Sequence, residues 1–208
     1  RLLSSAISAY GEPELESNKI ETQNLEKQQT INNKNYYLIN SLDEIDKWIE
    51  EAEEVGEVAV DTETTSLDPH QADLVGISLC SKVGKACYIP VGHKSPKCLK
   101  KDAVIKKLKK ILEDPSIKKI GQNIKFDFIV FYKCGITLSS MEDTMLMSYV
   151  LDAGKNRHNM DTLSEIHLGH KTISFKEMVG TGKKEINFSE VELDKAKDYA
   201  AEDADVTF

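Results

Sequence analysis

The sequence of 208 residues contains no apolar run close to the roughly 18 residues that a membrane-spanning helix needs, which excludes a spanning segment and gives no reason to expect a membrane partner. It has four cysteines and no CxxC pair, which argues against a disulfide-dense fold and against a structural zinc site. Its 11 glycines and 5 prolines show no collagen-like repeat. A composition that is 40% hydrophobic and 30% charged is typical of a soluble domain with a sizeable core.

The four cysteines are Cys80, Cys87, Cys98 and Cys134. The first residues contain no charged and then apolar signal segment, so we expect free thiols that are buried or half-buried. Cys80 and Cys87 flank a short turn between two expected strands. A disulfide across that hairpin therefore stays an open alternative.

Positive charge is in the minority, because 27 Lys and Arg stand against 35 Asp and Glu, for a formal net charge of −8. Binding to nucleic acid is dominated by phosphate charge, so this balance excludes strong general DNA binding by the chain, although not DNA chemistry at a local site. The charge is uneven, with ten lysines and three acids between Lys94 and Lys119. We interpret that stretch as a solvated helix face in preference to a DNA groove.

Residues 1–35 are rich in Glu, Asn, Gln and Ser and have no sustained apolar period. This composition predicts a linker or a poorly ordered tether. The chain starts at Arg1 and stops at Phe208 inside a strongly patterned segment, so we expect a fragment of a longer protein with one folded domain at 36–208.

The remaining residues alternate between strand-like and helix-like patterns. A strand at 36–39 is followed by a capping-box pattern, Ser41 to Glu44, and by a helix that ends at Gly56. Further strands are predicted at 58–60, 74–80, 86–91 and 118–121, the first three as a meander, and further helices at 102–113, 124–133, 142–151, 161–168 and 192–208. This order predicts the α/β class, with a mixed sheet flanked by helices.

Three segments carry residues suited to metal chemistry, and the first is a pair of acids at a strand end. Asp61 and Glu63 follow the apolar run Val58 to Val60 and are two residues apart, so an extended chain places both carboxylates on one face. A divalent cation removes their mutual repulsion, and hard oxygen ligands favour Mg²⁺ or Mn²⁺. Taken alone, the pair fits a solvated strand end equally well.

The second segment spans residues 121–127. Asn123 and Asp127 are four apart, which predicts that they share one helix face, and Asn123 also fits a helix cap. Asp127 precedes an apolar run, Phe128 to Phe131, in which an acid needs a partner. We therefore expect the Asp127 carboxylate to be paired.

The third segment is the helix expected at 192–208, which carries Tyr199 and Asp203 on one face. A stripe of small apolar residues runs beside them, at Leu193, Ala196, Ala200 and Ala204. This stripe lets the helix approach a sheet closely and brings Tyr199 and Asp203 to the strand ends. Glu202 and Asp205 point elsewhere and are expected to be solvated. Alone, the segment fits a charged surface helix better.

Two weaker patterns are set aside. Val179 to Lys184 looks like a phosphate loop, but it lacks the Gly and the Ser or Thr that the P-loop needs. His167 and His170 fit a helix end better than a metal site, and Asp143 and Asp161 fit helix starts.

Together, the order Asp-x-Glu, Asn-x-x-x-Asp and Tyr-x-x-x-Asp resembles the DEDD exonuclease superfamily, tyrosine subtype. Four stretches look like the 3′–5′ proofreading domain of bacterial family A DNA polymerases: Gly121 to Asp127, Asp143 to Leu146, Arg157 to Leu163 and Tyr199 to Thr207. The resemblance covers residues 36–208. It implies a ribonuclease H-like α/β fold, preceded by a tether and followed by a polymerase domain in the parent chain.

In that family two divalent ions sit between the acids. The resemblance implies that Asp61 bridges both ions and that Glu63 and Asp203 hold the first. Asp127 would help to hold the second, and Tyr199 would orient the attacking water. The metals would be Mg²⁺ or Mn²⁺, with Zn²⁺ as an option at one site. The implied reaction releases nucleoside 5′-monophosphates from a DNA 3′ end, as in proofreading during replication and repair.

The resemblance also implies contacts to the frayed strand, at Thr62, Leu67, Asn123, Phe126 and Arg157. Leu67 or Phe126 would pack on the terminal bases, since stacking holds single strands without sequence preference, although both also fit plain core packing. Arg157 would contact a phosphate. Phe126 stands where relatives often carry Tyr, so the ring is kept and a hydroxyl is lost.

The expected partners are a single-stranded or frayed DNA 3′ end and a polymerase domain in the same chain, in a monomer of the bacterial cytoplasm. Two alternatives remain, an RNA-acting 3′–5′ exonuclease of the ribonuclease D type and a module that positions a strand without cutting it. All five catalytic side chains of the family are present, which favours an active enzyme. The stretch Tyr199 to Asp205 favours the polymerase type over the ribonuclease D type.

Overall fold

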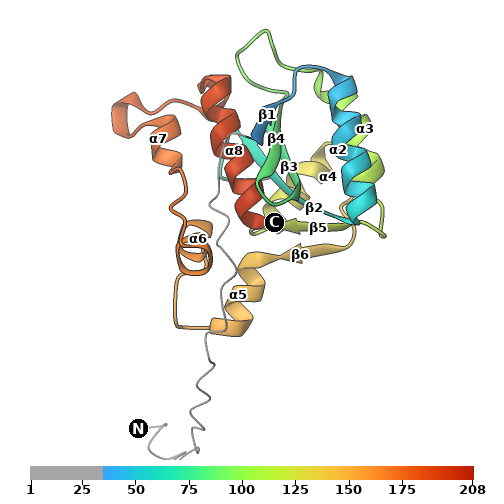
Figure 1. The fold of residues 1–208 in the computed structure, drawn as a ribbon. Coiled ribbons are helices and arrows are strands. Elements are labelled where there is room, and N and C mark those ends of the chain that lie inside the picture. Colours follow the sequence, from blue (N-terminus) through green and yellow to red (C-terminus); the bar gives the residue numbers. More distant parts are fainter. Residues whose placement is uncertain (1–34) are drawn as a thin grey trace, which may run out of the picture.

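The computed structural model describes residues 35–208 (Figure 1), so the tether predicted at 1–35 lies outside this part except for its last residue. The strands are β1 (Tyr36–Leu38), β2 (Glu57–Thr64), β3 (Leu74–Lys82), β4 (Lys85–Pro90), β5 (Lys118–Gly121) and β6 (Met141–Asp143). The helices are α2 (Leu42–Val55), α3 (Lys101–Leu112), α4 (Lys125–Lys133), α5 (Thr144–Asp152), α6 (Met160–Leu168), α7 (Phe175–Val179) and α8 (Leu193–Thr207). Among these helices, none is both long and apolar enough to cross a bilayer.

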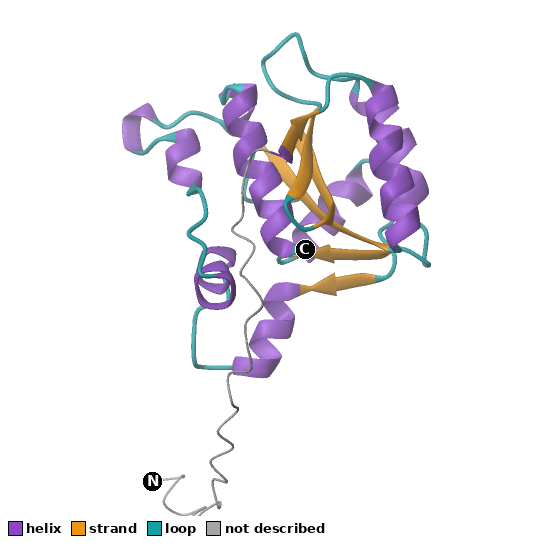
Figure 2. Cartoon of the chain, in the orientation of Figure 1, coloured by secondary structure: helices purple, strands orange, loops and turns teal. Residues whose placement is uncertain are grey.

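The strands form one mixed sheet in the order β1-β4-β3-β2-β5-β6. β2, β3 and β4 pair antiparallel with their neighbours in sequence, which confirms the predicted meander. β1 lies parallel to β4, β5 parallel to β2, and β6 parallel to β5. Helices cover both faces of the sheet (Figure 2), so the predicted α/β class with a flanked mixed sheet is confirmed.

Helix starts are where the sequence prediction needs correction. β6 occupies residues that were expected to begin a helix, because Met141–Asp143 pair with β5 and the helix α5 begins only at Thr144. Asp143 caps that helix as predicted, since its carboxylate accepts from the amides of Met145 and Leu146. The predicted capping box at Ser41 does not form, because the Ser41 side chain accepts no helix amide and Glu44 accepts from the amide of Asn40, one residue before Ser41.

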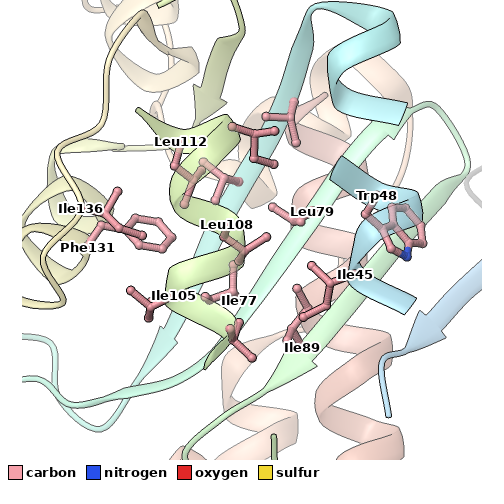
Figure 3. Close-up of a cluster of buried hydrophobic side chains, with 14 of the residues drawn as sticks. Ile45, Trp48, Ile77, Leu79, Ile89, Ile105, Leu108, Leu112, Phe131 and Ile136 are labelled. Atoms are coloured by element: carbon pink, nitrogen blue, oxygen red, sulfur yellow. The ribbon is translucent and has the colours of Figure 1, made fainter. Parts of the chain in front are cut away.

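The larger core lies between the sheet and the pair α2 and α3 (Figure 3). It is built from Ile45 and Trp48 of α2, Leu108 and Leu112 of α3, and Ile77 of β3, among others. These side chains are 0–7% exposed. Full burial of a side chain of this size contributes roughly 1.5–3 kcal/mol, so this face supplies the rigid support for β2.

The opposite face of the sheet carries α8, and small residues let the helix lie close to it. Ala201 and Ala204 are fully buried against Ala59 of β2 and Ala86 of β4. The predicted close approach of this helix to the sheet is therefore confirmed. As a result, the side chains of α8 that face β2 are brought to the end of that strand.

The cysteines form no disulfide. Cys80 pairs in register with Ala86, and Cys87 pairs with Leu79, so the two thiols are not opposite each other. Cys87 packs with the α2 and α3 core, and Cys80 packs with α8, on the other face of the sheet. All four cysteines are free thiols, as expected from the composition.

The lysine-rich stretch is largely engaged within the fold. Lys107 and Lys110 of α3 form ion pairs with Asp46 and Glu53 of α2, each at 2.5 Å. Lys119 is fully buried, and its ammonium group donates to backbone carbonyls, that of Ile117 at 2.5 Å among them; burial lowers its pKa to about 8. These lysines support helix packing and turns, and α3 lies on the sheet face opposite α8.

Candidate active site

The strand β2 presents two acids on one face. Ala59 packs against α8, and side chains alternate along a strand, so Asp61 and Glu63 point to the α8 face as well. Asp61 pairs in register with Ser78 of β3, in the centre of the sheet. The register shifts between Glu63 and Thr64, the last residue of β2, which pairs with Leu74. The two carboxylates therefore sit at the point where β2 ends.

The helix α8 brings a third acid to this point. Carboxylate oxygens of Asp61, Glu63 and Asp203 all lie within 4.8 Å of one another. Tyr199 lies one helical turn before Asp203, and both side chains line the same cavity. The small residues that bury α8 against the sheet are thus what brings Asp203 to the acids of β2.

Asp127 approaches β2 from its other side. Thr62 lies between the two acids of β2 and points to the opposite face. Its backbone amide donates to Asp127 Oδ1 at 2.9 Å, and its hydroxyl donates to the same oxygen at 2.5 Å. Asp127 is 3% exposed, and it stands apart from the group of three. The expected partner of this buried acid is therefore Thr62.

The arrangement of the four acids makes their ionised forms unfavourable. Burial raises the pKa of Asp61 to about 6. Burial, followed by the negative charge of Asp61, raises the pKa values of Glu63, Asp127 and Asp203 well above their ordinary range. The three buried carboxylates and the half-buried one of Asp61 are stable as anions only with a counter-charge. A set of oxygen donors alone fits a hard divalent cation such as Mg²⁺ or Mn²⁺.

Tyr199 stays a neutral phenol in this environment. Burial, together with the charge of the neighbouring Asp203, raises its pKa far above the ordinary value. Its ring lies 5.9 Å from that of Phe188 and 6.2 Å from that of Phe175, measured between centroids. The hydroxyl is therefore held by an aromatic cluster at the edge of the acids, where it can donate or accept a hydrogen bond.

Asp61, Glu63 and Asp203 form one end of a cavity of about 510 Å³, which Asp127 does not line. Its walls come from the end of β2, from α4 and from the segment 175–188. Leu67 is 91% exposed on the rim, and Phe126 is partly buried against the core. Leu67 therefore has no core role, whereas Phe126 both packs and lines the cavity. A space of this size suits a ligand such as a nucleotide.

Two residues expected at the strand-binding surface do not line this cavity. Asn123 precedes α4 with a left-handed φ of 59°, so it does not share a helix face with Asp127, and its side chain caps no helix amide. Its Oδ1 is buried without a hydrogen-bond partner. Arg157 is exposed in the connection between α5 and α6. The other three, Thr62, Leu67 and Phe126, do line the cavity.

The prediction that Glu202 and Asp205 are solvated is wrong. Glu202 is 6% exposed and Asp205 is 4% exposed. Asp205 accepts from the Tyr36 hydroxyl at 2.8 Å and from the Gly84 amide at 2.7 Å. The Glu202 carboxylate forms hydrogen bonds with His170 and Ile173, in the connection between α6 and α7. α8 packs against the sheet and against α6 and α7, so these acids find partners in the elements beside the helix.

Sequence reasoning missed the wall formed by residues 175–188. Phe175 and Ile186 are about 40% exposed, and both line the same cavity as Leu67. Phe188 is buried and stacks on Phe175, with the ring planes 7° apart. The segment contains one α-helix, α7, whose five residues are too few to produce a helical period. Its apolar residues, Phe175, Met178, Val179, Ile186 and Phe188, are the signal that the sequence offers.

Comparison with known protein families identifies the family of this chain. The sequence profile of a family described as 3′–5′ exonuclease matches residues 36–208, a span that contains all four acids and Tyr199. The chain belongs to this 3′–5′ exonuclease family. The chain is therefore a nuclease by family, and the resemblance inferred from its three acidic motifs is confirmed.

Curated relatives of this exonuclease are DNA polymerases I. That of Rhizobium leguminosarum is 44% identical over 194 residues, which cover 83% of this chain and 19% of the relative. That of Pseudomonas aeruginosa is 45% identical over 168 residues, which cover 78% of this chain and 18% of the relative. The chain thus spans about a fifth of the length of these relatives and corresponds to their exonuclease domain.

Solved structures similar to this exonuclease share its fold. Escherichia coli RNase D superposes with a TM-score of 0.61 and 21% identity, over 83% of this chain and 42% of that one. Brucella melitensis NrnC with bound Mg²⁺ superposes with a TM-score of 0.56 and 24% identity, over 85% of this chain and 71% of that one. The predicted ribonuclease H-like fold is confirmed by these neighbours.

Proposed function

We propose that this domain hydrolyses DNA from its 3′ end, releases nucleoside 5′-monophosphates, and serves proofreading in replication and repair. The observation that carries the proposal is the position of the acids. Asp61, Glu63 and Asp203 lie at the end of a cavity whose rim is apolar and aromatic, so a terminal nucleotide seated on the rim places its phosphate at the acids. DNA is the proposed substrate because the relatives above 40% identity are DNA polymerases.

The acids suit two divalent ions, which we propose to be Mg²⁺ or Mn²⁺, with Zn²⁺ as an option at one position. Asp61, Glu63 and Asp203 would hold the first ion, and Asp61 and Asp127 the second. When bound, such ions activate a water and offset the negative charge that develops on the scissile phosphate. Because burial raises the pKa values of all four acids, the same ions keep them ionised at neutral pH.

The side chains around the acids have separate tasks in this proposal. Tyr199 keeps its proton and orients the attacking water through its hydroxyl. Thr62 holds Asp127 in place through two hydrogen bonds. Leu67, Phe126 and Phe175 contact the terminal base, since flat and apolar side chains bind any base by its face. Arg157 and Asn123 remain candidates for contact with the strand outside the cavity.

Leu67→Ala tests the rim. Because Leu67 is 91% exposed, its loss removes contact with the substrate and leaves the core intact. We expect KM for a single-stranded oligonucleotide to rise about tenfold, through loss of one apolar contact to a base, with Tm unchanged. Val83→Ala, an exposed apolar residue in the β3–β4 hairpin, is the control and should leave KM unchanged. An unchanged KM in Leu67→Ala would place the base elsewhere.

Matched DNA and RNA oligonucleotides test the substrate. The 2′-hydroxyl lets a binding site distinguish the two, so we expect kcat/KM with Mg²⁺ to be at least about tenfold higher on DNA. A higher rate on RNA would favour the ribonuclease D type, whose fold this chain shares. Release from neither strand, above the level of an Asp61→Ala control, would favour a module that positions a strand without cutting it.

The setting of the reaction is also part of the proposal. We propose that the domain works in a longer, monomeric polymerase chain on DNA of the bacterial cytoplasm. The support is that the bacterial relatives named DNA polymerase I are about five times longer than the matched region. An acidic domain that binds DNA weakly suits this setting, because a polymerase domain in the same chain would supply most of the affinity.

A further inference from the structure

Glu202 is a buried acid that the proposed reaction does not use. It precedes Asp203 on α8, but its side chain faces the connection between α6 and α7. One carboxylate oxygen accepts from the Ile173 amide at 2.6 Å, and the other lies 2.8 Å from His170 Nε2. Both oxygens of a 6% exposed carboxylate are thus bonded to a single stretch of chain. Such charge-assisted bonds are among the strong ones in proteins.

The stretch that Glu202 holds has further ties to α6. The Ser164 hydroxyl donates to the His170 carbonyl at 2.9 Å, and the Thr172 hydroxyl donates to Asp161 at 2.8 Å. These bonds join the connection to α6 only. The hydrogen bonds that Glu202 accepts join the connection to α8, the helix that carries Tyr199 and Asp203.

Two residues beyond Ile173, the chain reaches the cavity wall. Phe175 stacks on Phe188 at 6.1 Å and contacts Tyr199 at 6.2 Å, measured between ring centroids. Its exposed part faces the cavity into which the acids point. The position of the Phe175 ring therefore follows from where the backbone of Ile173 is fixed.

Few residues of the cavity wall, residues 175–188, are buried. From Phe175 to Asn187, Val179 is the one buried residue among those whose side chains the structure describes. At its far end, the Asn187 amide group donates to the Thr65 carbonyl at 2.9 Å, and Phe188 enters the core. A segment with few buried contacts depends on its end points for its position. Glu202 provides the end point next to Phe175.

The geometry points to Glu202 as a positioning residue for the substrate's 3′ end. By fixing Ile173, it fixes the Phe175 wall at the distance from Leu67 and the acids that seats a terminal nucleotide. This inference rests on the proposed exonuclease function. Glu202 itself touches neither the proposed metal positions nor the substrate, so it acts on the binding of the 3′ end and leaves the chemical step alone.

Two substitutions separate the effect of the length of the Glu202 side chain from the effect of its charge. Glu202→Asp keeps the charge but withdraws the carboxylate by one methylene, and Glu202→Gln removes the charge but keeps an acceptor for the Ile173 amide. With the 208-residue chain, Mg²⁺ and a single-stranded DNA oligonucleotide, we expect Glu202→Asp to raise KM about tenfold and Glu202→Gln less than about threefold. In both variants kcat stays within about threefold of wild type, because the loss is one of uniform binding.

A double-mutant cycle tests the route through Phe175. Phe175→Ala should raise KM, and Glu202→Asp added to it should change KM less than twofold further, because the wall residue that Glu202 positions is already gone. Asp194→Ala, an exposed acid on the same helix, is the control and should leave both constants unchanged. Amide exchange at residues 170–175 should be faster in Glu202→Asp and unchanged at β2.

The outcomes are distinct. If wild type releases no nucleotides from DNA, the proposed function fails, whatever Glu202 does. If wild type is active and Glu202→Gln is impaired more than Glu202→Asp, the charge beside Asp203 is what matters, and the positioning role is wrong. Additive effects in the double mutant, or a fall in kcat at constant KM, would also overturn it. If Glu202→Asp fails to fold, exchange in Glu202→Gln decides: faster exchange at 170–175 without a change in KM contradicts the proposal.

Discussion

Asp61→Asn should lower nucleotide release from single-stranded DNA by at least about 10³-fold, since metal ions supply several kcal/mol of charge stabilisation and each 1.4 kcal/mol is a factor of ten. Asp61 interacts with each of the other three acids. Its carboxylate oxygen lies within 4.8 Å of those of Glu63 and Asp203, and its negative charge raises the pKa of Asp127. Asn keeps the shape of the side chain but offers one neutral oxygen where the proposed ions need anionic ones. The measurement is the single-turnover rate with saturating Mg²⁺.

The affinity for the oligonucleotide should change much less than this rate, because the rim residues are untouched. Asp43→Asn, an exposed acid at the start of α2, is the matched control and should retain the wild-type rate. Chelation of divalent ions should stop release by wild type. If Asp61→Asn keeps more than a tenth of the wild-type rate, Asp61 does not bridge the two ions.

Divalent ions should stabilise the fold at pH 8 and have little effect at pH 5. The acids have raised pKa values in the folded chain, that of Asp61 being about 6, against ordinary values near 4. The folded chain therefore binds more protons than the unfolded one between these values, and the stability that the cluster contributes is lost as pH rises through that window. Saturating Mg²⁺ or Mn²⁺ at pH 8 should raise Tm by about 5–10 °C, measured by calorimetry.

Asp203→Asn is the companion variant for this measurement. It removes one negative charge from the cluster, so the metal-free chain should gain ~1–2 kcal/mol of stability at pH 8. The same change removes a proposed metal ligand, and the rise of Tm on adding metal should shrink to less than half. Asp43→Asn should behave as wild type in both respects. A metal effect of equal size at pH 5 and pH 8 would contradict a metal site built from these acids.

Local patterns were sufficient to predict most elements. Alternation along β2 correctly predicts a buried strand with both acids on one face, and the small residues of α8 predict its close packing on the sheet. β6 escapes prediction because two of its three residues are acids, and α7 because five residues are too few to show a period. The left-handed turn at Asn123 also escapes, since its amide is held by Asp143, 20 residues later in the chain.

Charge placement is where sequence reasoning fails most clearly. Glu202 and Asp205 look solvated because an acid without a nearby basic residue in sequence is most often exposed. Their partners, the Ile173 and Gly84 amides and the Tyr36 hydroxyl, come from three separate parts of the chain. Backbone amides carry no side-chain signature, so no reading of the sequence can single them out as partners.

The chemical inventory of this exonuclease follows from sequence alone. The spacing of Asp61 and Glu63 on a strand, and of Tyr199 and Asp203 on a helix, decides which side chains share a face, because backbone periodicity is a local property. Only the tertiary structure brings the carboxylate oxygens of Asp61, Glu63 and Asp203 within 4.8 Å of one another, because their distance depends on how α8 packs on the sheet. The same long-range packing closes the cavity with residues 175–188, fixes that wall through Glu202, and raises the pKa values that call for a divalent ion.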